Sequence, residues 1–176
     1  MRKRLGVMCS GNGTNFENIV KSCWDHEVVL MIYNNKDCGA VQRATKYGIP
    51  SAYFTHKEEA KIINEFKWQK VDYIILAGWM RILSEGFIDA FPNRIINVHP
   101  SLLPKHKGLH AVEQAIHSKD KITGCTVHYV NNELDGGEII QQAKVPIFDT
   151  DNTEILTKRI QREEYRILPE VIKKLP

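Results

Sequence analysis

A run of five apolar residues, Tyr73-Ile74-Ile75-Leu76-Ala77, limits the folds that this chain can adopt. A strand that is apolar on both faces has to be covered on both faces, as in the centre of a mostly parallel sheet. Other short apolar runs lie along the chain, and segments with helical periodicity separate them. This alternation predicts an α/β fold with crossover helices. The expected strands are Leu5–Cys9, Val28–Tyr33, Val71–Ala77 and Ile95–Val98, and the expected helices are Asn15–Cys23, Gly39–Tyr47, Lys57–Phe66 and His110–Ser118.

The C-terminal third has a different pattern. Thr126–Val130 and Ile139–Val145 are strand-like and flank the polar turn Asn131–Gly137, so we expect a small antiparallel extension there. The run Asp151-Asn152-Thr153-Glu154 has the spacing of a capping box, which predicts that the last helix begins near Asp151. Pro169 is expected to end that helix.

Length and composition indicate one domain over residues 1–176. Hydrophobic residues make up 43% of the 176 residues and charged residues 26%, which is enough apolar material for a sizeable core. We therefore predict a Rossmann-like, mostly parallel sheet flanked by helices, with a small antiparallel C-terminal extension. The net charge of +3 is too small to indicate a nucleic-acid partner, but it suits a small anionic substrate.

The chain carries no pattern of a membrane protein or of an exported one. It has no run of about 20 apolar residues, and the apolar run Leu5–Cys9 is too short for a signal peptide. The 4 cysteines are scattered, without a CxxC pair, which is typical of reduced thiols. We therefore expect a cytoplasmic protein with no membrane partner.

The first candidate site is Ser10-Gly11-Asn12-Gly13-Thr14-Asn15, between the first strand and the first helix. Glycines allow the backbone to turn tightly and to present its N–H groups to an anion, and the helix N-terminus adds further donors. A phosphate would fit there, although the run is neither GxxxxGK[ST] nor GxGxxG. A tight turn with a capping residue is the alternative, and this run alone does not decide between them.

The second candidate is Asn97-Val98-His99-Pro100, at the end of an apolar strand. Asn97 and His99 are two residues apart, so their side chains point to the same side. Ligands of open α/β sheets bind at the carboxyl ends of strands, and an Asn and a His together can stabilise an oxyanion. The alternative is a polar strand end whose hydrogen bonds are satisfied within the protein.

The third candidate is the turn Asn131–Gly137, where Asp135 could pair with His99. Its alternative is an ordinary hairpin turn, for which Asp-Gly-Gly is well suited. A metal site is not expected. No Cys/His set has the spacing of a zinc site, and Gly108 between His106 and His110 argues against one helix carrying both histidines.

Four segments together resemble the phosphoribosylglycinamide (GAR) formyltransferase family. They are SGNGTN at Ser10–Asn15, AGWMRIL at Ala77–Leu83, INVHPSLLP at Ile96–Pro104 and ELDGG at Glu133–Gly137. Weaker similarity continues to the last helix, so the resemblance spans nearly the whole chain. It implies transfer of a formyl group from the co-substrate 10-formyltetrahydrofolate to the amine of GAR in de novo purine biosynthesis, by a monomer or weak homodimer.

The resemblance also implies the role of particular residues. Asn97, His99 and Asp135 match the catalytic residues of the family. The positions that match GAR contacts are Gly13, Thr14, Asn15, Gln161, Arg162, Glu163 and Glu164. The positions that match the folate pocket are Met80, Arg81, Ile82, Leu83, Asn97, Asn131, Asn132, Glu133, Leu134 and Asp135, with Lys57 as the candidate for a basic residue of the family.

The chain departs from the family pattern in three places. The segment Tyr53–Lys70 is shorter than usual, Lys107 stands where a Pro is common, and the chain ends at Pro176, before the family's usual C-terminal extension. Three alternatives stay open: another folate-dependent N-formyltransferase, a formyltetrahydrofolate hydrolase, and a catalytically inactive module that binds a nucleotide or folate. The first two differ from the main interpretation in the acceptor, and the third predicts binding without turnover.

Overall fold

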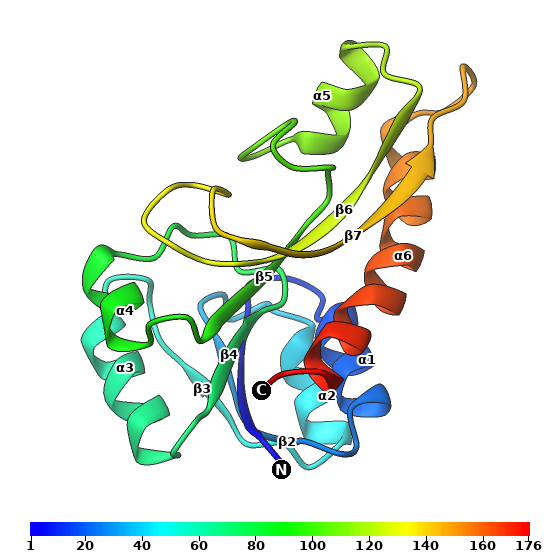
Figure 1. Cartoon of the computed structure of the whole chain (residues 1–176). Coiled ribbons are helices and arrows are strands. Elements are labelled where there is room, and N and C mark those ends of the chain that lie inside the picture. The colour runs from blue at the N-terminus through cyan, green and yellow to red at the C-terminus, as the bar shows by residue number, and fades with distance from the viewer. The chain divides into compact units, whose positions relative to one another are not determined.

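The computed structural model describes all residues from Met1 to Pro176 (Figure 1). The chain groups into two compact units, Met1–Asn97 and Val98–Pro176. None of its helices is both long and apolar enough to span a membrane. All 4 cysteines are buried, and none forms a disulfide.

Parallel strands form the centre of the first unit. Hydrogen-bonded neighbours follow the order β3-β2-β1-β4-β5. The strands are β1 (Arg4–Cys9), β2 (Glu27–Tyr33), β3 (Ser51–Tyr53), β4 (Tyr73–Leu76) and β5 (Ile95–His99). All four residues of β4 are buried, and β1 is buried from Leu5 onward. The apolar run therefore does form an interior strand, as predicted.

Helices cover both faces of this part of the sheet. They are α1 (Thr14–Ser22), α2 (Ala40–Lys46), α3 (Glu59–Trp68) and α4 (Glu85–Ala90). Helices α1 and α2 pack together on one face, and α3 and α4 pack together on the other (Figure 1). Phe66 of α3 lies directly over Gly6 of β1, where a Cβ atom would approach its ring to 2.5 Å. A side chain at Gly6 would thus push α3 away from the sheet.

The second unit consists of an antiparallel strand pair and two helices. Strands β6 (Ile122–Tyr129) and β7 (Ile139–Pro146) pair antiparallel, with Ile122 opposite Pro146 and a register shift between Val127 and His128. Helix α5 (Ala111–His117) precedes them, and helix α6 (Thr153–Lys173) packs against both strands. Both strands of the predicted antiparallel extension are therefore present. Within the two units, the elements and pairings confirm the predicted fold class.

The last helix begins near Asp151, as predicted, but its predicted capping residue and its predicted end were wrong. Asn152, not Asp151, caps α6, because its side chain accepts a hydrogen bond from the Ile155 N–H. Asp151 instead forms an ion pair with Arg159. Pro169 does not end the helix but lies buried inside it, and the helix continues to Lys173. The lost backbone hydrogen bond costs about 3 kcal/mol, and the burial of apolar side chains around Pro169 offsets that cost.

Two short elements were not predicted. Strand β3 has 3 residues and is only partly buried, so it shows no apolar run. Helix α4 has 6 residues and contains Gly86, so it is too short to show a helical pattern of apolar residues in the sequence. Ser84 starts this helix by accepting a hydrogen bond from the Phe87 N–H.

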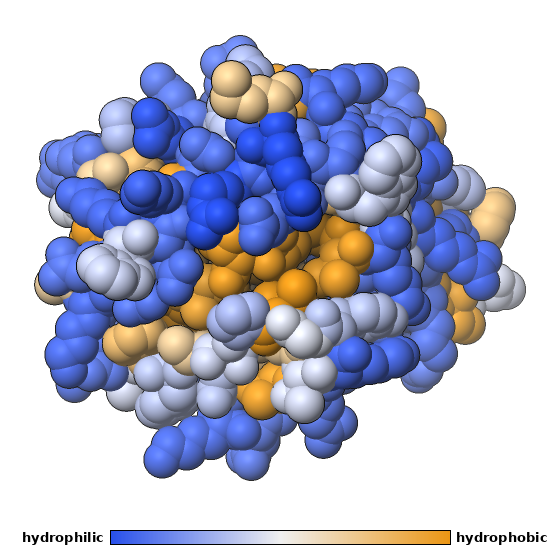
Figure 2. Space-filling model, turned by 90° about the horizontal axis from the view of Figure 1, so that it is seen from below, coloured by the Kyte–Doolittle hydropathy of each residue, from blue (hydrophilic) through white to orange (hydrophobic).

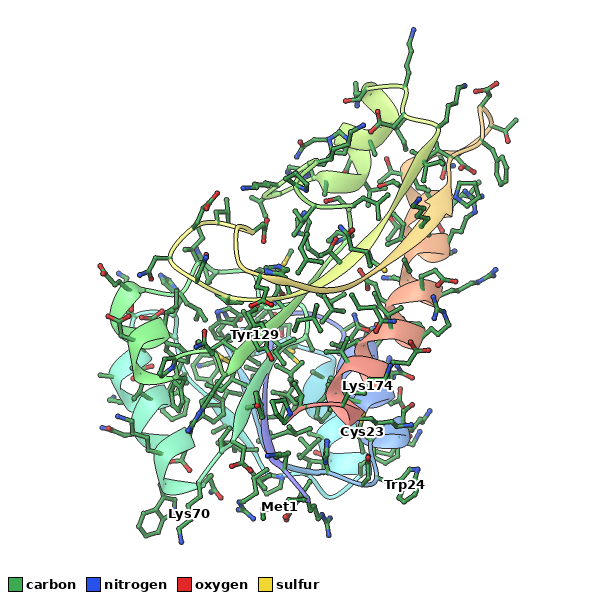
Figure 3. All side chains as sticks on the ribbon, viewed as in Figure 1. Met1, Cys23, Trp24, Lys70, Tyr129 and Lys174 are labelled. Atoms are coloured by element: carbon green, nitrogen blue, oxygen red, sulfur yellow. The ribbon has the colours of Figure 1, made fainter.

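A cavity of about 580 Å³ lies at the amino-terminal ends of β1 and β2, and its lining includes Arg4, Trp24, Glu27 and Ile49. Figure 2 looks toward this end of the molecule and shows apolar side chains in a hollow surrounded by hydrophilic ones. Trp24 lies at the same end (Figure 3). None of the predicted site residues lines this cavity.

Candidate functional site

The loop between β1 and α1 has the geometry of an anion site. Gly13 adopts a left-handed conformation with φ of 75° and is the N-cap residue of α1. No side chain caps this helix end. Gly13 at the N-cap has no side chain that could cap the helix, and the positive end of the helix dipole lies at this turn, which suits an anionic ligand.

Neighbouring side chains hold this loop in shape. The Arg43 guanidinium donates a hydrogen bond of 2.8 Å to the Asn12 carbonyl and also contacts the Glu17 carboxylate. The Cys38 thiol lies 2.8 Å from the Gly11 carbonyl. The loop backbone is thus restrained by three contacts from α2 and the segment before it, which are made by Arg43, Cys38 and Ala40.

The predicted folate segment lies beside the same loop. The Ser10 N–H donates to the Gly78 carbonyl, and the Ser10 hydroxyl accepts from the Met80 N–H, both at 2.9 Å. Met80 and Ile82 are 66% and 78% exposed, whereas Leu83 is buried. Exposed apolar side chains next to a polar loop are suited to contact a flat, partly apolar ligand.

His99 and Asp135 lie close together in the second unit. The His99 Nδ1 atom is 3.5 Å from Asp135 Oδ2, and the two side chains are 8% and 9% exposed. The other ring nitrogen, Nε2, is 2.8 Å from the His106 carbonyl. A carbonyl only accepts, so Nε2 carries a proton and donates it. This contact directs Nδ1 toward Asp135.

Asp135 is held by its own backbone and by a neighbouring loop. Its φ of 49° is left-handed, a conformation that Asp tolerates better than most residues. Its Oδ2 atom accepts a 2.8 Å hydrogen bond from the Gly108 N–H. The carboxylate therefore has a fixed position next to His99, as a residue that orients an imidazole requires.

A second histidine, His128, faces the same carboxylate. Its Nε2 atom is 3.8 Å from Asp135 Oδ1, which is beyond hydrogen-bond distance, and its Nδ1 donates to the Tyr129 carbonyl at 2.9 Å. Burial lowers the pKa of His128 below its ordinary value, although the Tyr129 carbonyl and Asp135 oppose this effect. His128 therefore favours the uncharged form of its imidazole beside the His99–Asp135 pair.

The remaining predicted contacts occupy three places. Asn131, Asn132, Glu133 and Leu134 are exposed in the turn that follows β6, and Lys107 contacts Glu133 at 2.9 Å. Lys57 is exposed just before α3. On α6, the predicted contacts are Gln161, Arg162, Glu163 and Glu164.

On α6, Glu164 is buried while Arg162 is exposed. Burial raises the pKa of the Cys125 thiol to about 12, and the charges of Glu164 and Glu163 add to this effect.

Asn97, His99 and the other predicted residues fall into two groups. The phosphate-type loop and Met80–Leu83 belong to the first unit, which ends at Asn97, and His99, Asp135 and α6 belong to the second. Asn97 and His99 are on one strand, β5, two residues apart. No group of three or more His, Cys, Asp or Glu side chains could hold a metal ion.

The sequence pattern of the formyl transferase family matches residues 3–172. This chain belongs to that family. The phosphoribosylglycinamide formyltransferase of Haemophilus influenzae is 40% identical to this formyl transferase over 182 residues, which cover 97% of this chain and 86% of that protein. The trifunctional purine biosynthetic protein adenosine-3 of Drosophila melanogaster is also 40% identical, over 184 residues. That alignment covers 97% of this chain and 14% of the fly protein, so this formyl transferase spans a small part of its length.

Solved structures of related proteins have the same fold. Glycinamide ribonucleotide transformylase 1 from Symbiobacterium toebii has a TM-score of 0.95 at 38% identity and covers 98% of this chain and 86% of that one. Phosphoribosylglycinamide formyltransferase from Anaplasma phagocytophilum has a TM-score of 0.95 at 40% identity, with the same coverage. The fold of this formyl transferase is thus that of these relatives.

Four residues near the predicted site were missed by sequence reasoning. Arg43, His106, Gly108 and His128 all make contacts to the loops or to Asp135. His106 and Gly108 lie in the segment after INVHPSLLP and were considered only as a possible metal site. His128 lies at a strand position whose sequence pattern is that of a core residue. Only its proximity to Asp135, 7 residues later, distinguishes it from such a residue.

Proposed function

We propose that this formyl transferase moves the formyl group of 10-formyltetrahydrofolate to the amine of 5′-phosphoribosylglycinamide, a step of de novo purine biosynthesis. The observation that carries this proposal is the buried pair of His99 and Asp135 at the end of β5, in a chain that matches its family over residues 3–172. Relatives named phosphoribosylglycinamide formyltransferase support GAR as the acceptor.

The reaction begins when the neutral amine of GAR attacks the formyl carbon. Negative charge then develops on the formyl oxygen, and donors placed around it lower the barrier. Asn97 and protonated His99 are the donors in this proposal. Because Nε2 of His99 already donates to the His106 carbonyl, Nδ1 is the nitrogen left to donate to the formyl oxygen, which would have to lie beside Asp135.

Proton transfer completes the reaction. The attacking nitrogen loses a proton, and the N10 nitrogen of the folate gains one when its bond to the formyl carbon breaks. Asp135, which lies 3.5 Å from His99 Nδ1, orients the imidazole, stabilises its charge and helps to order a water that carries this proton. The products are formylglycinamide ribonucleotide and tetrahydrofolate, so the step needs no oxidant or metal.

The two substrates require different contacts. Gly13, Thr14 and Asn15 at the start of α1 would bind the GAR phosphate, and Gln161–Glu164 on α6 would contact its glycinamide portion. Met80–Leu83, Lys57 and the Asn131–Asp135 turn would surround the folate. The left-handed Gly13 and the exposed Met80 and Ile82 support these assignments.

Release of tetrahydrofolate from 10-formyltetrahydrofolate tests the proposal. We expect release that depends on GAR, and none with an amino-sugar nucleotide as the acceptor. Release without any acceptor would indicate a hydrolase instead. Tight binding of both ligands without turnover would indicate an inactive binding module, and no reaction with GAR would contradict the phosphate-loop assignment.

We further propose that the 176 residues act as a single domain, as a monomer or weak homodimer in the cytoplasm, without nucleic-acid or membrane partners. The modest net charge of +3 supports the absence of a nucleic-acid partner. Light scattering over a concentration series would measure the oligomeric state, and one cooperative unfolding transition is expected for a single domain.

A further inference from the structure

The loop between β5 and α5 supplies the group that orients His99. The His106 carbonyl receives the His99 Nε2 proton at 2.8 Å. Ser101, which is fully buried, donates its hydroxyl to the neighbouring Lys105 carbonyl at 2.6 Å and reaches the His106 carbonyl at 3.3 Å. The direction of the His106 carbonyl thus decides how the His99 ring is turned.

His106 itself has an unusual backbone conformation. Its φ is 54°, a left-handed value that costs an ordinary residue about 1–2 kcal/mol. No glycine or asparagine stands at this position to relieve the cost. His is one of the residue types that adopt this conformation more often than most, and a contact of the His106 side chain further restrains the residue.

The His106 side chain is anchored to Asp120. Its Nε2 atom lies 2.7 Å from Asp120 Oδ2, and the two side chains are 13% and 16% exposed. Lys105 adds a cation at 3.4 Å from the same carboxylate, but its side chain is 65% exposed. The hydrogen bond from His106 is the main reason that the pKa of Asp120 lies below its ordinary value. The half-buried His106 contact is therefore the stronger restraint.

We propose that His106 and Asp120 form a positioning pair that orients the catalytic imidazole of His99 through the His106 carbonyl. This inference rests on the proposed function, because it assigns a role in the same reaction. The chain of contacts runs from Asp120 to the His106 side chain, through the His106 backbone, to His99 Nε2. Neither residue of the pair touches the reacting atoms.

The pair should act on the rate of the chemical step rather than on substrate binding. Loss of the anchor lets the His106 carbonyl rotate, and the His99 proton donor then loses its direction. A displacement of about 1 Å in a catalytic group can lower a rate by about 100-fold. The contacts assigned to GAR and folate lie on other segments, so their KM values should stay at the wild-type level.

Three variants and one control test this proposal. Asp120→Ala removes the acceptor, and Asp120→Asn keeps an amide oxygen that still accepts from His106. His106→Asn is too short to span the same gap, yet Asn tolerates the left-handed conformation. Asp151→Ala is the matched control, because it breaks another shielded ion pair of the same unit, with Arg159, that does not contact His106.

We expect kcat to fall about 10- to 100-fold in Asp120→Ala and in His106→Asn, with both KM values unchanged. Asp120→Asn should recover most of the activity, and Asp151→Ala should keep the wild-type kcat. If Asp120→Ala fails to fold, His106→Asn decides the outcome. Wild-type kcat in folded His106→Asn, or an equal loss in Asp151→Ala, would overturn the proposal.

A second readout does not depend on turnover. The ¹⁵N resonance of His99 Nε2 reports its hydrogen bond to the His106 carbonyl, so it should move in Asp120→Ala and His106→Asn and stay in place in Asp151→Ala. If the wild-type protein transfers no formyl group to GAR, the proposed function fails, and this resonance alone tests the positioning pair. An unmoved resonance in both anchor variants would overturn it.

Discussion

Substitution of Gly13 tests whether the loop before α1 depends on its backbone conformation. Gly13→Ala places a side chain on a residue with φ of 75°, and the new Cβ would lie 2.5 Å from the Ala40 Cβ and 2.6 Å from its Cα. The second contact is to the backbone, so rotation of a side chain cannot relieve it. Because carbon atoms pack at about 3.5–4.0 Å, α1 and α2 would have to separate by roughly 1 Å.

Two costs add up in this variant. The left-handed conformation costs about 1–2 kcal/mol with a Cβ present, and overpacking costs about 1–3 kcal/mol. The unfolding free energy of Gly13→Ala should therefore fall by about 2–5 kcal/mol. Gly48→Ala is the matched control, because Gly48 has φ of 66° and no atom within 4 Å of its new Cβ, so only the first cost applies.

Urea unfolding measures both variants, with the slope of the transition as a check on two-state behaviour. Steady-state kinetics of the folded fraction should show a raised KM for GAR in Gly13→Ala and an unchanged KM for 10-formyltetrahydrofolate. Equal destabilisation of Gly13→Ala and Gly48→Ala would refute the clash with Ala40. A wild-type KM for GAR would refute the role of the loop in phosphate binding.

Three further predictions concern the catalytic residues and the response to acid. Asn97→Ala should lower kcat by about 10²–10³ while the chain stays folded, and stopped-assay turnover at the wild-type rate would contradict its role as an oxyanion donor. In Asp135→Asn the new residue tolerates the φ of 49°, so the fold should be kept while kcat falls by about 10²–10⁴. Rapid-quench kinetics would measure the fall in kcat, and an unchanged circular dichroism spectrum would show that the variant is folded. Burial lowers the pKa of His128 below its ordinary value of 6.5, so as the pH falls the unfolded chain takes up this proton before the folded chain does. The unfolding free energy should therefore fall as the pH decreases below 6.5, by at most about 1.4 kcal/mol per pH unit. His128→Asn, which keeps a donor to the Tyr129 carbonyl, should flatten the urea-derived stability curve in this range, and an unchanged slope would count against the assignment.

Much of the fold could be predicted because its strands carry strong apolar runs. β4, for example, is buried at every residue and is preceded and followed by helices. The predictions failed where the stabilising contacts are distant in sequence or the elements are short. Pro169 stays in α6 because its surroundings are buried, and β3 gains its structure from pairing with β2 at the edge of the sheet.

The candidate site shows the same difference between residues that belong to local motifs and contacts that join distant parts of the sequence. Gly13, His99 and Asp135 belong to motifs, so their residue types and spacing indicate their roles. The contacts that fix them join residues far apart in the chain, such as Gly108 to Asp135 and His106 to Asp120, which are 27 and 14 residues apart. Patterns of period 2 or 3.6 carry no information on such pairs.

The left-handed residues of the second unit connect these observations. His110 and Lys119 flank the two ends of α5, where the first is the N-cap residue and the second follows the last turn, a place where this conformation is common. His106 and Asp135 lie in loops instead, and each is restrained by a hydrogen bond of its side chain, to Asp120 and from Gly108. Both also contact His99. Left-handed backbone at these two positions is maintained by contacts that orient the same imidazole, which is the arrangement expected if His99 has the catalytic role proposed for it.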